Sequence, residues 1–154
     1  MHNRLIVSLF AAGFASVAGN ALAADHCSAN EAKAMADKAV AAVKSLGADK
    51  AFAEFSQKDN PAWHNKDCYV FVVKYDGMVG AHGGNAALVG KNVLDMKDAD
   101  GQPFQKLMID KAKTGSGWVD YKWSNPVSKE ISAKSSYVQP LPGLNALAGV
   151  GIYK

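Results

Sequence analysis

The chain has 154 residues with 17 basic and 14 acidic side chains, which give a formal net charge of +3. Lysines and acids are mixed along the sequence without a basic block, and Arg4 is the single arginine, so little supports a nucleic-acid-binding role. Beyond the first 23 residues, no apolar run approaches the roughly 20 residues that a membrane helix needs.

The first 23 residues have the features of a secretory signal peptide. Arg4 supplies a positive charge, the apolar run 5–19 follows, and Ala21-Leu22-Ala23 fits a signal-peptidase site. The run is too short and too rich in small residues to span a bilayer stably, and the residues before Cys27 lack the lipoprotein pattern. We therefore expect residues 1–23 to be removed and residues 24–154 to form one periplasmic domain without a membrane anchor.

Two cysteines, Cys27 and Cys68, lie in the expected mature chain. In an oxidising compartment such a pair indicates a disulfide, here between the start of the chain and the first predicted strand. A disulfide that closes a loop of this length stabilises a fold by about 4 kcal/mol on the chain-entropy model. The alternative is a redox or metal site, but the sequence has no Cys-x-x-Cys motif, so we predict the disulfide.

A long helix is the first predicted element. Residues 28–31, Ser-Ala-Asn-Glu, form a capping box, in which the serine hydroxyl and the glutamate carboxylate satisfy reciprocal backbone donors. Apolar residues then recur at helical spacing until Gly47, which ends or kinks the helix. A shorter helix over 49–57 follows. The expected apolar face of the long helix carries Met35, Ala39, Val43 and Leu46.

The rest of the chain predicts strands with one further helix. A β-branched and aromatic run over 68–75, the turn Asp76-Gly77 and the run 78–82 indicate a hairpin. Residues 83–102 mix glycine, asparagine and aspartate with short apolar pairs, which is typical of loops and one-turn helices. Pro103 opens a helix that ends near 114–117. The last three expected strands are 118–123, 130–140 and 146–153.

This order of elements predicts an α+β fold. We expect an antiparallel sheet of about five strands, with the long N-terminal helix packed on one face and the shorter segments over the other face. Such an architecture is PAS-like.

The sequence offers no catalytic or metal-binding motif. The aspartates of 95–101 are out of register for a calcium loop, because Met96 and Leu107 would occupy the first and twelfth ligand positions. His26, His64 and His82 lack the spacing of a metal site. Ser116 lies between a helix and a strand, in the wrong order for a nucleophile elbow. We therefore expect neither an enzyme nor a bound cofactor.

The aromatic strand 118–123 has two interpretations. Strict alternation puts Val119, Tyr121 and Trp123 on one face of the sheet and Trp118 on the other. Tyr121 and Trp123 could form a pocket wall with their polar ends toward a ligand, or fill a core. His82, at the end of its strand, likewise could donate to a ligand or to a loop carbonyl.

Several motifs together resemble the single Cache domain, type 2, of bacterial extracytoplasmic sensors. The resemblance runs from about Glu31 to the C-terminus and is specific in the combination of its motifs. It also agrees with the PAS-like fold expected from the order of elements. The segments that carry it are YDGMVGAHGGNAALVGKNVLDMKDADGQPF, GSGWVDYKWSNPVSKEISAKSSYV and GVGIYK.

The resemblance implies a binding pocket on the sheet face away from the N-terminal helix. Tyr121 and Trp123 would wall it, Lys134 would oppose a ligand carboxylate, and His82 and Tyr137 would offer hydrogen bonds. A regular strand, however, places residues 134 and 137 on opposite faces, so either a bulge separates them or only one faces the ligand. Ligands of the family include acetate, lactate, pyruvate and propionate.

The resemblance also implies a role in signal transduction or chemotaxis. Family members usually form the outer part of chemoreceptors or histidine kinases, whereas this sequence stops at Lys154 without a following membrane helix. We therefore expect a free-standing periplasmic domain that acts with a membrane receptor or kinase. Many relatives have proline where this chain has Gly83, which puts the ligand contact of His82 in question. The competing hypothesis is an interaction protein whose pocket is degenerate.

Overall fold

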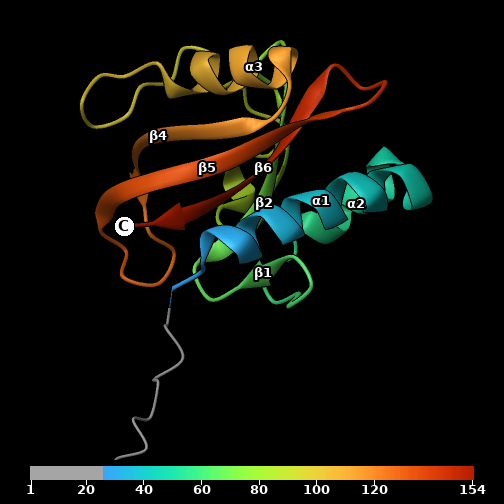
Figure 1. The fold of residues 1–154 in the computed structure, drawn as a ribbon, viewed down its shortest axis with the longest axis horizontal. Helices are drawn as coiled ribbons and strands as arrows, with labels where there is room; N and C mark the ends of the chain where they lie inside the picture. Colours follow the sequence, from blue (N-terminus) through green and yellow to red (C-terminus); the bar gives the residue numbers. More distant parts are fainter. Residues whose placement is uncertain (1–25) are drawn as a thin grey trace, which may run out of the picture.

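The structure is a computed structural model that describes residues 26–154 (Figure 1). The predicted signal peptide, residues 1–23, lies outside the described residues. Within the described range, no helix is both long enough and apolar enough to cross a bilayer. The helical elements are α1 (Ala29–Leu46), α2 (Ala48–Phe55), the single turn η1 (Ala86–Leu88) and α3 (Phe104–Thr114).

Helix α1 begins at the predicted capping box. The Ser28 hydroxyl accepts the Glu31 backbone N–H, and the Glu31 carboxylate accepts the Ser28 N–H at 2.8 Å. This hydrogen bond is the main reason that the pKa of Glu31 is lowered to about 2. The buried stripe of the helix differs in part from the prediction, because Leu46 at the end of α1 is exposed and small residues lie against the sheet instead. The buried residues are Ala32, Ala36, Ala39, Ala42 and Val43.

The strands form one antiparallel sheet in the order β1-β2-β6-β5-β4, and β3 pairs with β2 beside β1. The structure confirms the five predicted strands and adds the two-residue β1. Their bounds are β1 (His64–Asn65), β2 (Cys68–Lys74), β3 (Val79–His82), β4 (Gly117–Ser124), β5 (Ile131–Leu141) and β6 (Ala146–Tyr153).

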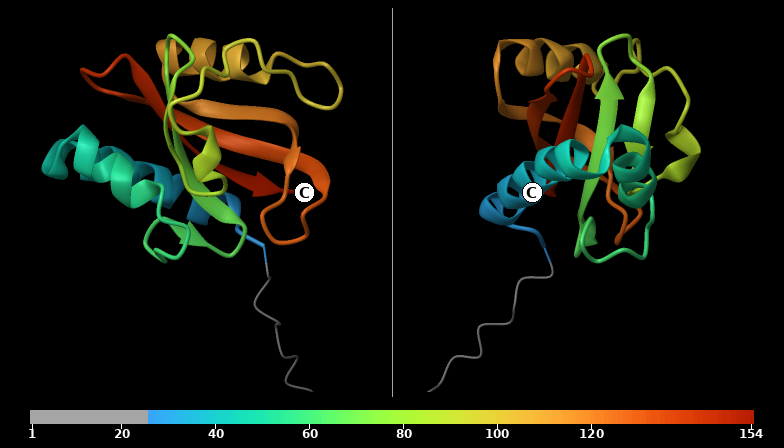
Figure 2. Two further views of the ribbon diagram at one scale, coloured as in Figure 1. Left: turned by 180° about the vertical axis from the view of Figure 1, so that it is seen from behind. Right: turned by 90° about the vertical axis from the view of Figure 1, so that its right-hand side faces the viewer.

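Helices cover both faces of the sheet (Figures 1 and 2). Residues 68, 70 and 72 of β2 pack beneath α1 and α2, whereas residues 69, 71 and 73 pack toward α3. The alternation of one central strand therefore divides the interior into two apolar clusters, one on each face. The cluster under α3 contains the candidate site.

The start of α1 is fastened to the start of β2. Cys27 and Cys68 form the predicted disulfide, across 41 positions of sequence. The buried Asp67 carboxylate accepts the Cys27 N–H at 2.7 Å and contacts Nδ1 of His26 at 2.8 Å. A disulfide and two polar contacts thus join residues 26–27 to residues 67–68.

Candidate ligand-binding site

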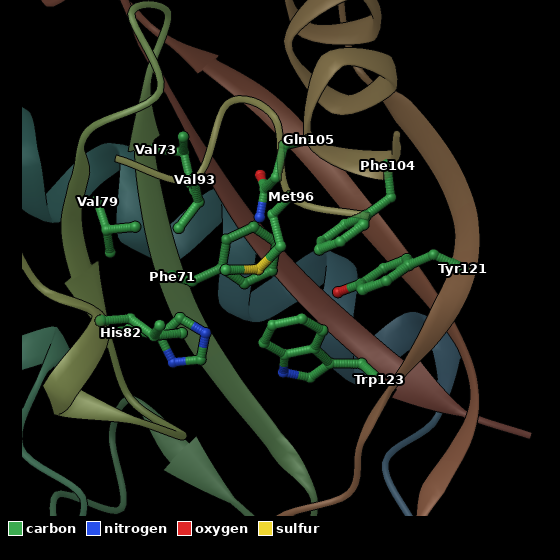
Figure 3. A pocket seen from close by; sticks show the side chains of 11 residues that line it. Phe71, Val73, Val79, His82, Val93, Met96, Phe104, Gln105, Tyr121 and Trp123 are labelled. Atoms are coloured by element: carbon green, nitrogen blue, oxygen red, sulfur yellow. The ribbon is translucent and has the colours of Figure 1, made fainter. Parts of the chain in front are cut away.

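A pocket lies between the sheet and α3 (Figure 3). Strands β2, β3 and β4 supply one side, and η1, the 93–96 segment and α3 supply the other. The enclosed space is about 10 Å³, room for about one water molecule. Even a two-carbon acid is larger than one water molecule, so a ligand must move some of the side chains that close the pocket. The lining residues are Phe71, Val73, Val79, His82, Leu88, Val93, Met96, Phe104, Gln105, Tyr121 and Trp123.

Lys134 lies beside this pocket on β5, with only 1% of its surface exposed. Its ammonium group donates a hydrogen bond to the Tyr69 hydroxyl at 2.7 Å. It also lies within 6 Å of four aromatic ring centroids, the range of cation–π attraction. Two of these rings, Phe71 and Tyr121, line the pocket itself. The distances from Nζ are 4.1 Å to Tyr69, 4.8 Å to Tyr153, 5.8 Å to Phe71 and 5.8 Å to Tyr121.

The electrostatic surroundings of Lys134 do not compensate its charge. Among residues 26–154, no carboxylate forms an ion pair with Lys134. Burial lowers the pKa of Lys134 well below its ordinary value of 10.5, and the opposing effect of the Asp67 carboxylate is smaller. A buried amine in this state is stabilised by an anion that reaches it, because the anion supplies the missing opposite charge.

His82 presents a hydrogen-bond donor to the pocket. Its Nδ1 accepts the Asn85 backbone N–H at 2.9 Å, which leaves the ring proton on Nε2. Burial, and to a smaller degree the charge of Lys134, lowers the pKa of His82 to about 3. The ring is therefore neutral near pH 7. It stacks on Phe71, with 6.1 Å between ring centroids.

Tyr121 and Trp123 lie on the pocket face of β4, as the alternation predicts. The Tyr121 ring stacks on Phe104 at 4.6 Å, and its hydroxyl contacts Ser136 Oγ at 3.0 Å. Trp123 packs at a tilt against the same phenylalanine, at 5.4 Å. These side chains belong to the apolar cluster under α3 and also line the pocket.

Tyr137 lies on the opposite face of the sheet. Strand β5 runs without a bulge between Lys134, which faces Tyr121 of β4, and Tyr137, which faces Trp118. The Tyr137 ring packs against Trp118 at 5.3 Å, and Lys33 of α1 lies over it. The structure therefore brings together four of the five residues named from the sequence, and it places Tyr137 beneath α1.

Two glycines of β6 make room for the side chains of the site. A Cβ atom at Gly151 would lie 2.1 Å from Cε of Lys134, and one at Gly149 would lie 2.2 Å from the Phe71 ring. Lys134 and Phe71 come from β5 and β2, the two neighbours of β6. The absence of side chains on β6 thus lets both residues lie across the middle of the sheet.

A turn over 98–102 holds the upper wall of the pocket against β4. One oxygen of the Asp98 carboxylate accepts the backbone N–H groups of Asp100 and Gln102, and the other accepts the N–H of Lys122 at 3.0 Å. These hydrogen bonds contribute to the lowered pKa of Asp98. The turn lies between Met96 and α3, and both of these line the pocket. Its attachment to β4 therefore holds both of them in place over the sheet.

Sequence reasoning missed several members of the site, among them Tyr69, Phe71 and Gln105. Tyr69 and Phe71 belong to a strand that is apolar at nearly every position. Such a strand has no alternation that would predict which residues point to which face of the sheet. Gln105 is a polar residue in the first turn of a helix, a position that is usually exposed. The Gly-x-Gly of β6 was the one available signal, since glycine within a strand often marks a close approach of other groups.

Comparison with known proteins agrees with this architecture. The family model described as Single Cache domain 2 matches residues 16–154. The chain belongs to this family. Cache domains are extracytoplasmic sensor modules, so the protein is a sensor domain related to those of chemotaxis receptors and histidine kinases.

Relatives of this Cache domain occur in both receptor classes. The sensor histidine kinase MctS of Rhizobium johnstonii is 37% identical over 90 residues, which are 58% of this chain and 20% of the kinase. The solved methyl-accepting chemotaxis protein of Vibrio parahaemolyticus is 27% identical, with a TM-score of 0.70 over 80% of this chain and 86% of that one. A Cache chemosensory domain solved for its carboxylic acid recognition has a TM-score of 0.64 at 23% identity, over 80% and 86% of the two chains, and it shares the fold.

Proposed function

We propose that this Cache domain binds a short organic acid of the acetate, lactate, pyruvate or propionate type. The observation that carries the proposal is Lys134, a buried amine with no carboxylate partner in the described part of the chain. The ligand carboxylate pairs with Lys134 and accepts a further hydrogen bond from Nε2 of His82. The aromatic rings around the pocket exclude water and so strengthen both contacts.

The remaining lining favours a small and mostly apolar ligand body. Phe71, Phe104 and Trp123 supply flat surfaces, and the enclosed space is too small for a bulky group. The neutral state of His82 preserves its Nε2 donor across the physiological pH range. Such a site binds and releases its ligand without chemical change. We infer that the ligated domain acts on a membrane chemoreceptor or histidine kinase.

A thermal-shift screen with acids of two to four carbons tests this proposal. A ligand at 100 times its dissociation constant adds about 2.7 kcal/mol to the free energy of unfolding. Amines and amino acids serve as comparison compounds in the same screen. Amines carry no carboxylate, and amino acids carry an ammonium group beside it. If none of the acids raises the melting temperature, the competing hypothesis of a degenerate pocket replaces this one.

The variant Lys134→Met tests the role of the lysine directly. We expect the affinity for the best acid to fall by about 1.5–3 kcal/mol, the usual size of a charge-assisted hydrogen bond, as measured by calorimetric titration. The matched control is Lys50→Met, which removes an exposed lysine from α2 on the other side of the sheet. Equal affinities of the two variants would place the anion elsewhere.

A further inference from the structure

Gln105 is a buried polar residue that lines the pocket. It is the second residue of α3, and 7% of its surface is exposed. Its Oε1 atom is buried without a hydrogen-bond partner among the described residues. Figure 3 shows its amide group at the edge of the pocket near Met96, with the nitrogen directed toward the Phe71 ring.

The fold itself gives no reason for an amide at this position. The N-terminus of α3 has no side-chain cap, so Gln105 does not stabilise the start of its helix. The side chains nearest to it in Figure 3 are apolar and cannot accept or donate hydrogen bonds. An amide oxygen buried among them is unfavourable, and an apolar residue of similar size would fill the same space at lower cost. A ligand that pairs with the amide removes this cost.

We propose that Gln105 is a specificity-determining residue that selects short acids carrying a hydroxyl group. This inference rests on the proposed function, in which Lys134 and His82 hold the carboxylate. His82 and Gln105 lie on different sides of the Phe71 ring, so a short acid placed across that ring meets the His82 donor at one end and the amide at the other (Figure 3).

A hydroxyl group matches an amide better than the other substituents of small acids do. It both donates and accepts, so it pairs with Nε2, which faces the Phe71 ring in Figure 3, or, after rotation of the amide, with Oε1. A keto group only accepts and leaves Oε1 without a partner, and a methyl group leaves the whole amide unpaired. An ammonium group donates, but the pocket lining contains no carboxylate to balance its charge. The expected order of affinity is therefore lactate, pyruvate, propionate.

Calorimetric titration with lactate and propionate tests this selection, because the two acids differ by one hydroxyl group. We expect the wild-type protein to bind lactate at least about tenfold more tightly than propionate, since a site built to pair with a hydroxyl discriminates against the analogue that lacks it. In Gln105→Met, which keeps the length of the side chain, lactate affinity falls at least about tenfold and propionate affinity stays the same or rises. Gln57→Met, an exposed glutamine beyond α2, is the matched control.

A spectroscopic readout distinguishes recognition from a purely structural role. The side-chain amide resonances of Gln105 shift on addition of lactate and much less on addition of propionate, in the unmodified protein. Equal affinity of the wild type for both acids, or tighter binding of alanine than of lactate, overturns the inference and leaves the carboxylate site intact. Failure of every acid to bind overturns the proposed function together with it.

Discussion

The ammonium group of Lys134 and the imidazole of His82 lie in one low-dielectric environment, and burial lowers the pKa of both. Among residues 26–154, neither group forms an ion pair with a carboxylate. An arriving carboxylate raises the pKa of Lys134 and thereby favours its charged form. His82 remains neutral and keeps its donor in place. In the proposed complex, Lys134 therefore acts as the cation and His82 as a fixed hydrogen-bond donor.

The lowered pKa of His82 predicts how stability depends on pH. The unfolded chain binds a proton at this residue below about pH 6.5, whereas the folded protein binds it only near pH 3. Stability therefore falls as the pH decreases through this window, by at most about 1.4 kcal/mol per pH unit from this group. Urea unfolding between pH 6.5 and 4.5 measures the slope, and His82→Gln is expected to flatten it. Identical slopes for the two proteins would contradict the neutral buried histidine.

At the scale of elements, the pocket depends on how α3 and the segment before it are attached to β4. Asp98 accepts hydrogen bonds from its own turn and from Lys122 of β4, and Gln102 donates to the Asp120 carbonyl. These contacts also occupy polar groups on the edge of β4 that pairs with no other strand in the described sheet. One turn thus protects a sheet edge and positions a wall of the pocket.

Asp98→Ala is expected to loosen this wall without unfolding the domain. The amide of Lys122 should exchange faster with solvent, and ligand affinity should fall by about 1–2 kcal/mol because the segment must be ordered on binding. Hydrogen exchange and calorimetry measure the two effects. Asp100→Ala is the control, since it removes only an exposed ion pair with Lys122. If the Lys122 amide exchanged as slowly in Asp98→Ala as in the wild type, the turn would be held by other contacts.

Local signals predicted most elements, whereas non-local packing decided the site. The capping box at Ser28 and the alternation around Tyr121 are read within a few residues, and both agree with the structure. The position of β6 between β2 and β5 depends on pairing across more than 70 residues, which no local pattern encodes. The burial of Gln105 likewise exists only because α3 lies over the sheet. The resemblance to a family supplied Lys134, which periodicity alone could not distinguish from a surface lysine.

At the scale of the whole molecule, the sheet separates two apolar clusters, and the proposed ligand site belongs to one of them. One face carries α1 and α2 and is fastened by the disulfide between Cys27 and Cys68. The other carries α3 and the pocket. The matched 90 residues cover 20% of the MctS kinase, so the likeness does not extend to the kinase as a whole.

The crystal structure of the protein with the acid that stabilises it most tests the central claim directly. The account predicts that the carboxylate lies between the sheet and α3, with its oxygens about 3 Å from Nζ of Lys134 and from Nε2 of His82. A second, larger hollow lies beside α2, next to Phe52 and Gly80. An acid bound there, with the Lys134 ammonium still hydrogen-bonded to Tyr69 and to no ligand, would contradict the account.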